Sequence, residues 1–519
     1  MAHAQGSECR LSHDSMLLRA RCEGSHIPAM TPTICQEGPI LKQLNRFETG
    51  VAGLDVLLKG GLISGATYII QGRPGSGKTI LANQLAFNHV KSGGRALIAT
   101  LLAESHERLF QFLSTMSFYD KEKVGREVQY VSAFDTLQHD GLEEVVKLLR
   151  REIGRQQASV LIIDGLLNAC SQAGSTIDTK KFIAELQGHA AFAGCTVLFL
   201  TSSRLEDGSP EHTMVDGVIE LGEELIGTRS VRRIHLRKTR GSGALSGIHE
   251  CLIGDEGMVV HPRFEALYSR PSRIEFSDMA ALSSGLRSLD VIMGGGLPRS
   301  SVTLALGPSG SGKTSFGISF LGPCTSAEPG LHFGFYETPD RLKHKAKALG
   351  YDFQTKEDQG SLHIAWQPTT EGLLDGLGAR LLAMVDQYGI KRVVIDSFGG
   401  MAARCNNPAR LTLFFSSLMG ELRGRGVLVF ATWEIRGLFG PEIDVPSPDL
   451  SSIVDNILLM RFFEHKADLK RLLSILKVRD SVYDPSLREI VMDEYGVSLK
   501  KAFKSADLDG AAKPTIPEP

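Results

Sequence analysis

The 519-residue sequence predicts an α/β protein made of two tandem domains, each built on a doubly wound, mostly parallel sheet. Three observations predict this fold class: a long internal repeat, an alternation of short apolar runs with helical patterns, and a glycine-rich loop in each copy. At about 150 residues per domain the length alone allows roughly two to four domains. The repeat reduces this number to two.

The repeat is visible as paired landmarks at a nearly constant offset. Residues 47–79 recur as residues 282–314, and later landmarks keep the same spacing. An offset held within a few residues over this distance indicates duplicated domains. The landmarks are Lys78 and Lys313, Asp164 and Asp396, and the pairs Lys238/Arg240 and Lys477/Arg479, which lie 235, 232 and 239 positions apart.

The domain limits follow from the repeat and from composition. We expect a first domain over 41–268 and a second over 274–503, joined by a short polar linker that contains Pro271. The flanking segments 1–40 and 504–519 are predicted to be disordered tails.

Within each copy, apolar runs alternate with helical patterns. In the first copy we expect strands over 66–71, 96–103, 159–164 and 196–202, with helices over 79–91, 107–116 and 179–192. In the second copy we expect strands over 301–307, 332–337, 392–396 and 426–433. Each copy ends in a β-ribbon, over 230–240 and 470–480. Short apolar strands separated by helices imply a parallel sheet covered on both faces.

Composition excludes several classes of protein. With 57 Lys+Arg against 59 Asp+Glu, the net charge of −2 argues against binding nucleic acid through a basic surface. The eight cysteines form no C-x-x-C pair, which argues against a zinc site or a disulfide framework. The chain has no apolar run long enough to cross a membrane and no secretory signal, so we expect a cytoplasmic protein.

Two segments match G-x-x-x-x-G-K-[ST], the phosphate-binding loop (P-loop), and each lies between a strand and a helix pattern. Glycines let the backbone N–H groups wrap phosphates, and the lysine reaches the β- and γ-phosphates. We therefore predict two sites for ATP. Their residues are Gly72, Gly75, Ser76, Gly77, Lys78 and Thr79 in the first copy, and Gly307, Gly310, Ser311, Gly312, Lys313 and Thr314 in the second.

A magnesium site is predicted beside each P-loop. The loop threonines, Thr79 and Thr314, provide a hydroxyl ligand, and Asp164 and Asp396 end apolar strands at the same sheet edge. At the end of the next strand, Thr201, Ser202 and Thr432 are either sensors of the γ-phosphate or simple turn hydroxyls.

These blocks, with the G-x-x-x-L-D and G-G-G-L opening and the K-x-R ribbon, resemble the RecA-like ATPases of the KaiC family over about residues 41–500. The resemblance implies two RecA-like P-loop domains and a double-ring homohexamer with ATP between neighbouring subunits. It also implies ATPase activity in the N-terminal ring, and autokinase and phosphatase activity in the C-terminal ring.

The resemblance also implies roles for single residues. The family carries adjacent glutamates as general bases after the second core strand. Here these positions read Ala103-Glu104 and Tyr336-Glu337, so the second glutamate of each pair is retained. Glu104 and Glu337 are therefore the predicted bases, which act on water in a RecA-type ATPase.

The K-x-R pairs match the family's basic pair that reaches the neighbouring subunit's γ-phosphate, so Lys238, Arg240, Lys477 and Arg479 are assigned to nucleotide binding in trans. A charged, solvated ribbon face is the alternative.

The family's phospho-acceptors correspond to Ser451 and Ser452, for which two turn serines are the alternative. The first copy has Met214 and Val215 there, so only the second ring would be phosphorylated. Pro446 stands about where the family has a threonine.

Three functions are compatible with these features. The leading one is a hexameric ATPase with serine autokinase activity at the second domain. The second is a nucleotide-gated signalling scaffold that recruits partners such as sensor kinases or response regulators. The third is a DNA-dependent RecA-type ATPase, which the absence of a basic excess disfavours.

Overall fold

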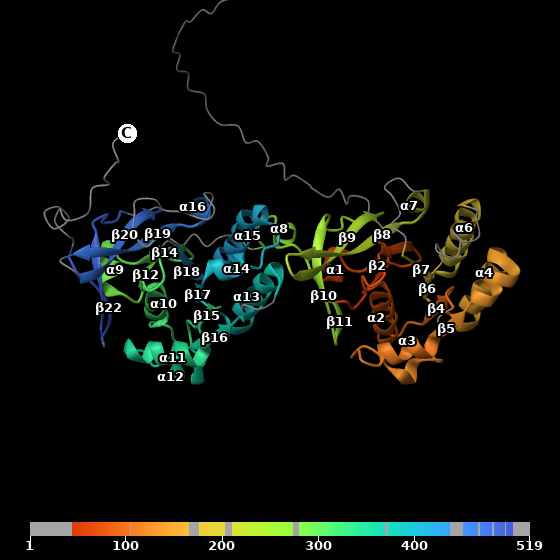
Figure 1. Cartoon of the computed structure of the whole chain (residues 1–519), viewed down its shortest axis with the longest axis horizontal. Coiled ribbons are helices and arrows are strands. Elements are labelled where there is room, and N and C mark those ends of the chain that lie inside the picture. Colours follow the sequence, from red (N-terminus) through yellow and green to blue (C-terminus); the bar gives the residue numbers. More distant parts are fainter. Residues whose placement is uncertain are drawn as a thin grey trace, which may run out of the picture. The chain divides into compact units, whose positions relative to one another are not determined.

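The computed structural model describes residues 44–103, 105–165, 176–202, 210–272, 280–368, 372–435, 450–465, 468–479, 482–493 and 495–501. Both predicted tails, Glu104 and Pro446 lie outside these ranges. The described residues form two nine-stranded, mostly parallel sheets flanked by helices (Figure 1). These are two tandem RecA-like domains, so the predicted fold class is confirmed.

The first sheet consists of β3 (Thr67–Gly72), β4 (Ala96–Thr100), β5 (Val128–Ser132), β6 (Val160–Asp164), β7 (Thr196–Thr201), β8 (Gly217–Ile226), β9 (Arg229–Thr239), β10 (Ile248–Gly254) and β11 (Gly257–His261). Their order is β11-β10-β9-β8-β3-β7-β6-β4-β5. The strands from β8 to β5 are parallel, and β9, β10 and β11 add an antiparallel extension. The main helices are α2 (Lys78–Lys91), α3 (His106–Leu113), α4 (Phe134–Gln156), α6 (Thr176–Ala193) and α7 (Pro210–Met214).

The second sheet repeats this topology strand for strand. It consists of β14 (Val302–Gly307), β15 (Gly330–Gly334), β16 (Leu362–Trp366), β17 (Arg392–Asp396), β18 (Leu428–Glu434), β19 (Asn456–His465), β20 (Asp468–Val478), β21 (Arg488–Asp493) and β22 (Gly496–Leu499). Their order is β16-β15-β17-β18-β14-β19-β20-β21-β22. The helices are α9 (Arg287–Ile292), α10 (Lys313–Leu321), α11 (Pro339–Ala348), α12 (Phe353–Asp358), α13 (Leu374–Tyr388), α14 (Phe398–Ala402), α15 (Leu411–Gly424) and α16 (Leu450–Ile453).

A short segment precedes each sheet in a matching way. In the first copy it contains α1 (Leu54–Leu57) and the strand pair β1 (Arg46–Phe47) and β2 (Leu62–Ile63). In the second copy it contains α9 and the pair β12 (Ala281–Leu282) and β13 (Leu297–Pro298). No helix in the described ranges is long and apolar enough to cross a membrane.

Each sheet has a hydrophobic core on both faces, because successive strand residues point to opposite sides. Tyr68 and Ile70 of β3 pack with α2, whereas Ile69 packs with α4 and α6. In the same way, Leu304 of β14 packs with α13 and α15, and Ala305 packs with α10. The two-sided covering predicted from continuous apolar strands is therefore present.

Some elements differ from the prediction for identifiable reasons. The strand β5 and the helix α4 were not predicted: β5 is a half-exposed edge strand, and Gly141 interrupts the helical pattern with a φ of 80°. The predicted strands 96–103 and 332–337 end earlier, at Thr100 and Gly334, because the chain leaves the sheet there.

A short helix, α8 (Phe264–Leu267), follows the first sheet and packs into the core of the second repeat. The Phe264 ring lies 5.3 Å from the Phe414 ring. The backbone N–H of Phe264 donates to Asp375 Oδ1 at 2.9 Å. The helix α8 therefore lies within the segment predicted as the first domain, 41–268, but contributes to the hydrophobic core of the second repeat.

Acid is expected to destabilise the protein through His249 on β10. This ring is fully buried, and its Nδ1 accepts a hydrogen bond from the backbone N–H of Arg263 at 2.9 Å. Burial lowers the pKa of His249 to about 4, below an unfolded value of about 6.5. The unfolded chain therefore binds the extra proton first, and up to about 3 kcal/mol of stability is lost as the pH falls from about 6.5 to 4.

Urea unfolding at pH 7.5 and pH 5 measures this loss. The variant His249→Asn keeps an acceptor but does not titrate, so its midpoint is expected to shift less with pH than that of the parent protein. Equal shifts in both proteins would contradict the role of His249.

Candidate functional site

The two P-loops connect β3 to α2 and β14 to α10. Gly77 and Gly312, which immediately precede the helices, have φ values of 96° and 105°. A Cβ at Gly312 would lie 2.0 Å from Met492 Cε, so a larger residue would displace that flexible side chain, and the positive φ is what favours glycine here. Neither helix has a side-chain cap at its N-terminus. The first N–H groups of α2 and α10 are thus positioned to bind an anion.

The P-loop lysines fold back over their own loops. Lys78 Nζ donates to the carbonyls of Gly72 at 2.8 Å and Arg73 at 2.9 Å. Lys313 Nζ donates to the carbonyls of Gly307 and Pro308, both at 2.7 Å. Burial lowers the pKa of both lysines. Two buried ammonium groups therefore lie at the loops that the sequence assigns to phosphate.

The loop serines are buried polar groups whose bonding is incomplete. The hydroxyls of Ser76 and Ser311 have no hydrogen-bond partner within the described part of the chain. A buried hydroxyl without a partner is unfavourable. A phosphate or a ligand-bound water would satisfy both, so these residues fit a nucleotide.

The predicted magnesium residues are brought together in both repeats. Thr79 Oγ1 lies 3.3 Å from Asp164 Oδ2, and Thr314 Oγ1 lies 2.9 Å from Asp396 Oδ2. Hydroxyl and carboxylate oxygens beside a phosphate loop are the ligand set that Mg²⁺ prefers. The residues present therefore fit this cation.

The threonines near the carboxyl ends of β7 and β18, Thr201 and Thr432, are not equivalent in the two repeats. Thr432 Oγ1 donates to Asp396 Oδ1 at 2.6 Å. The strand register matches Thr432 to Leu200, because Leu200 pairs with Asp164 and Ala431 pairs with Ile395. Thr201 and Ser202 instead match Trp433 and Glu434. The sequence predicts the same candidate role for Thr201, Ser202 and Thr432. The strand register shows that Thr432 occupies a different position from the other two.

The second P-loop opens into a cavity of about 500 Å³. It is lined by Ser309, Gly310, Gly312, Lys313, Thr314, Ser315, Tyr336, Glu337, Lys345, Asp396, Ser397, Thr432, Glu434, Arg471 and Met492. The predicted base Glu337 accepts a hydrogen bond from Lys345 Nζ at 2.5 Å. Its counterpart Glu104 lies outside the described residues.

Sequence reasoning missed three charged residues of this cavity: Lys345, Glu434 and Arg471. Arg471 Nε donates to the Gly310 carbonyl at 3.0 Å, and its guanidinium lies 5.9 Å from the Phe462 ring centre. The internal repeat could have indicated Arg471, because the strand register matches it to an arginine of the first repeat, Arg232. In the first repeat, Arg232 instead pairs with Glu223 at 3.7 Å.

In this single chain the K-x-R lysines bind carbonyls of their own repeat. Lys238 Nζ donates to the carbonyls of His212, Thr213 and Val215, at 2.7, 3.2 and 2.7 Å. Lys477 Nζ donates in the same way to Ser451 at 2.5 Å and Val454 at 2.8 Å. Both ammonium groups therefore satisfy carbonyls at the end of a short helix, α7 or α16.

The arginines of these pairs are more accessible. The side chain of Arg240 is 56% exposed beside Asp216, and that of Arg479 is 45% exposed beside Asp455. Arg240 also donates to the Thr213 carbonyl at 2.8 Å.

The candidate acceptors Ser451 and Ser452 are exposed residues of α16. The Ser451 carbonyl accepts from Lys477, and the Ser452 carbonyl accepts from Arg479 at 3.3 Å. Neither serine is among the residues that line the P-loop cavity.

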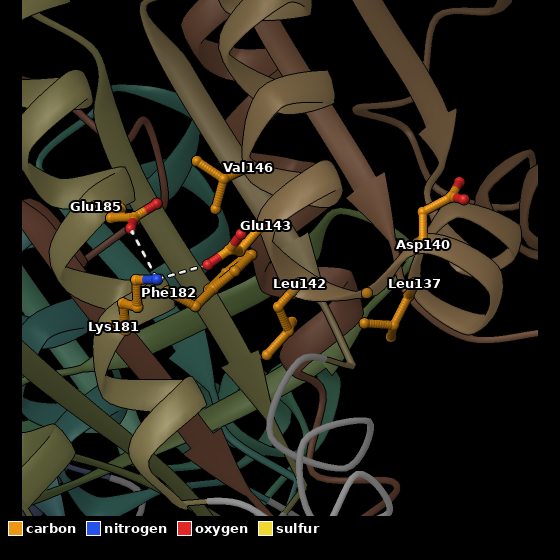
Figure 2. A pocket seen from close by; sticks show the side chains of 9 residues that line it. Leu137, Asp140, Leu142, Glu143, Val146, Lys181, Phe182 and Glu185 are labelled. Atoms are coloured by element: carbon orange, nitrogen blue, oxygen red, sulfur yellow. Dashed lines mark hydrogen bonds and ion pairs between the residues drawn. The ribbon is translucent and has the colours of Figure 1, made fainter.

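A separate cavity of about 390 Å³ lies between α4 and α6 of the first repeat (Figure 2). Its wall combines apolar side chains, including Val146 and Phe182, with Lys181, which pairs with Glu143 at 2.5 Å and Glu185 at 4.0 Å. No P-loop residue lines it, and its described lining holds three carboxylates, Asp140, Glu143 and Glu185, against one ammonium group, that of Lys181. It therefore lacks the P-loop and the paired threonine and aspartate that mark the cavity of the second repeat.

Comparison with known proteins gives a consistent result. The family model described as "ATPase: KaiC" matches residues 47–265 and 282–503. "Circadian clock oscillator protein KaiC" of Picosynechococcus sp. is 26% identical over 507 residues, covering 93% of this chain and 95% of that protein. The protein of the same name from Synechococcus elongatus is 25% identical over 501 residues, covering 91% and 92%.

Proposed function

Because this chain belongs to the KaiC family of ATPases, we propose that it binds ATP with Mg²⁺ at both P-loops and hydrolyses it. The observation that carries this proposal is the duplicated arrangement of a buried P-loop lysine beside a paired threonine and aspartate. Family membership supports ATPase activity in general, and the residue roles below are our assignments.

The lysines, Lys78 and Lys313, bind the β- and γ-phosphates and stabilise the charge that develops between them. The pairs Thr79/Asp164 and Thr314/Asp396 hold Mg²⁺. A magnesium ion held by these residues would supply positive charge against the phosphates.

Glu337 accepts the proton of the attacking water in the second site, and Lys345 fixes the carboxylate at 2.5 Å. Glu104 has the same role in the first site. Arg471 lies at the edge of the second cavity and adds a positive charge near the P-loop.

We propose that the chain assembles into a homohexamer in the cytoplasm, with nucleotides between neighbouring subunits. The exposed arginines Arg240 and Arg479 are the groups that reach a neighbour's γ-phosphate. The lysines Lys238 and Lys477 position them by anchoring the ribbon to α7 and α16. This division of roles is supported by the carbonyl contacts of the lysines and the exposure of the arginines.

We further propose serine autokinase activity at Ser451 and Ser452. Both serines are exposed, and neither of them lines the cavity of its own repeat. Phosphate transfer therefore takes place between subunits, from one subunit's nucleotide to the next subunit's α16.

Incubation of the purified full-length protein with labelled ATP tests both activities in one sample. We expect ADP release together with label on Ser451 or Ser452 by mass spectrometry. The double variant Ser451→Ala/Ser452→Ala is the control, which should release ADP but carry no label. ADP release without label at either serine would support the proposed ATPase activity and contradict the proposed autokinase activity.

A nucleotide-gated scaffold is the second candidate function. It is favoured by Ala103 and Tyr336, which replace the first glutamate of the family pair in both repeats. Such a scaffold would use ATP to assemble the ring and would recruit sensor kinases or response regulators. ATP-dependent hexamer formation in light scattering, with negligible ADP release, would support it over the ATPase.

A further inference from the structure

One buried histidine distinguishes the second nucleotide site from the first. Gly334 of β15 pairs with Asp396, and Thr100 of β4 pairs with Asp164, so Gly334 and Thr100 occupy matching positions. Two residues earlier, His332 of β15 therefore matches Ile98 of β4. The polar residue therefore occurs in one repeat only, on the strand beside the predicted magnesium ligand.

The His332 ring is almost fully buried, with 2% of its surface exposed. Neither ring nitrogen has a hydrogen-bond partner among the described residues. Nε2 lies 4.0 Å from Asp396 Oδ2, the oxygen that accepts from Thr314. A buried N–H without an acceptor costs about 1–3 kcal/mol, which favours a bond to this carboxylate.

The local packing is built around this ring. A Cβ at Gly334 would lie 2.5 Å from His332 Cε1, so no larger residue fits above the imidazole. In the first repeat the matched position is Thr100, whose Oγ1 lies 2.9 Å from His106 Nε2. The pair His332/Gly334 thus stands where the first repeat has Ile98/Thr100.

We propose that His332 is a positioning residue of the second site, which donates its Nε2–H to Asp396 and orients that carboxylate toward Mg²⁺. A movement of about 1 Å converts the present separation into a hydrogen bond. Because Asp396 also accepts from Thr314 and Thr432, His332 completes a set of donors around it. The inference rests on the proposed function, since it assigns a role at the proposed nucleotide site.

Binding of a fluorescent ADP to the full chain tests this role without measuring activity. Lys78→Ala in the background removes binding at the first repeat, and titrations are compared in Mg²⁺ and in EDTA. For His332→Ile, which installs the first-repeat residue, we expect affinity in Mg²⁺ to fall on the order of tenfold. In EDTA we expect a change below about twofold, because the carboxylate then has no cation to hold.

Two further variants separate orientation from packing. His332→Gln keeps an N–H near the position of Nε2 and is expected to restore most of the affinity in Mg²⁺. If His332→Ile does not fold, His332→Ile/Gly334→Thr installs the complete first-repeat pair and is measured instead. The control is His363→Ile on the neighbouring strand β16, because the His363 ring stacks on Tyr388 and does not line the cavity.

The outcomes are distinct. An equal loss in Mg²⁺ and EDTA, or no loss in either, would overturn the role of His332 while leaving the nucleotide site intact. If the protein with His332 in place shows no Mg²⁺-dependent binding, the proposed function itself fails.

Discussion

Replacing Lys78 and Lys313 together with alanine is expected to abolish measurable ADP release from the full-length protein. Both ammonium groups are buried at the start of a helix and bind P-loop carbonyls within 2.9 Å. No other lysine takes part in the two loops. Removing a preorganised charge from a phosphoryl-transfer site costs roughly 100- to 1000-fold in rate, so loss at both sites leaves no significant turnover.

The single variants assign turnover to each repeat, because each retains one intact P-loop. The matched controls are Lys91→Ala, at the opposite and exposed end of α2, and Lys347→Ala on α11. Both controls should release ADP at the parental rate. Undiminished ADP release by the double variant, measured on folded protein, would refute hydrolysis at the P-loops.

Much of the fold and of each phosphate site was predictable because the signals are local. A P-loop is specified by eight consecutive residues, and a strand-terminal aspartate by the apolar run before it. The structure accordingly places Thr314 and Asp396 at 2.9 Å although 82 residues separate them. The doubly wound, mostly parallel sheet was predictable in the same way, since alternating strands and helices leave few arrangements, but the order of its strands was not predicted.

The rest depended on register and packing, which no short window contains. Arg471 reaches Gly310 from a strand 161 positions away, and the ribbon register decides that it enters the cavity. Likewise, only the register shows that Thr432 matches Leu200. The lysines of the K-x-R pairs were assigned to a neighbouring subunit, whereas Lys238 binds carbonyls of its own repeat. Binding of the K-x-R pairs to a neighbouring subunit's nucleotide stays a prediction, and the carbonyl contacts of the lysines leave the arginines as the groups for this role.

The second large effect is expected at Arg410, which joins α8 to the second repeat. Its guanidinium donates to both carboxylate oxygens of Glu265, at 2.7 and 2.9 Å, and to both of Asp375, at 2.9 and 3.0 Å. The Asp375 side chain is fully buried, and that of Glu265 is 11% exposed. Arg410→Met would therefore leave the buried Asp375 carboxylate without this cation, while Glu265 would keep Arg263 at 3.6 Å.

Breaking a buried pair from one side costs about 3–5 kcal/mol, because the remaining charge is not compensated. We expect Arg410→Met to lower the free energy of unfolding by this amount, measured as the midpoint of urea unfolding. The control is Lys181→Met, which removes an exposed pair with Glu143 and should cost less than about 1 kcal/mol. Equal small effects in both variants would contradict a stabilising role for the α8 junction.

The pH dependence of the same variant identifies the cause. Burial raises the pKa of Asp375 to about 6, and the positive charge of Arg410 opposes this rise. Without Arg410 the pKa rises further, while the unfolded value stays near 3.9. When the folded pKa of a carboxyl is above its unfolded pKa, the folded protein loses stability as the pH increases from the unfolded to the folded value. Arg410→Met should therefore be less destabilised at pH 5 than at pH 7.5, whereas a loss of packing alone would be the same at both.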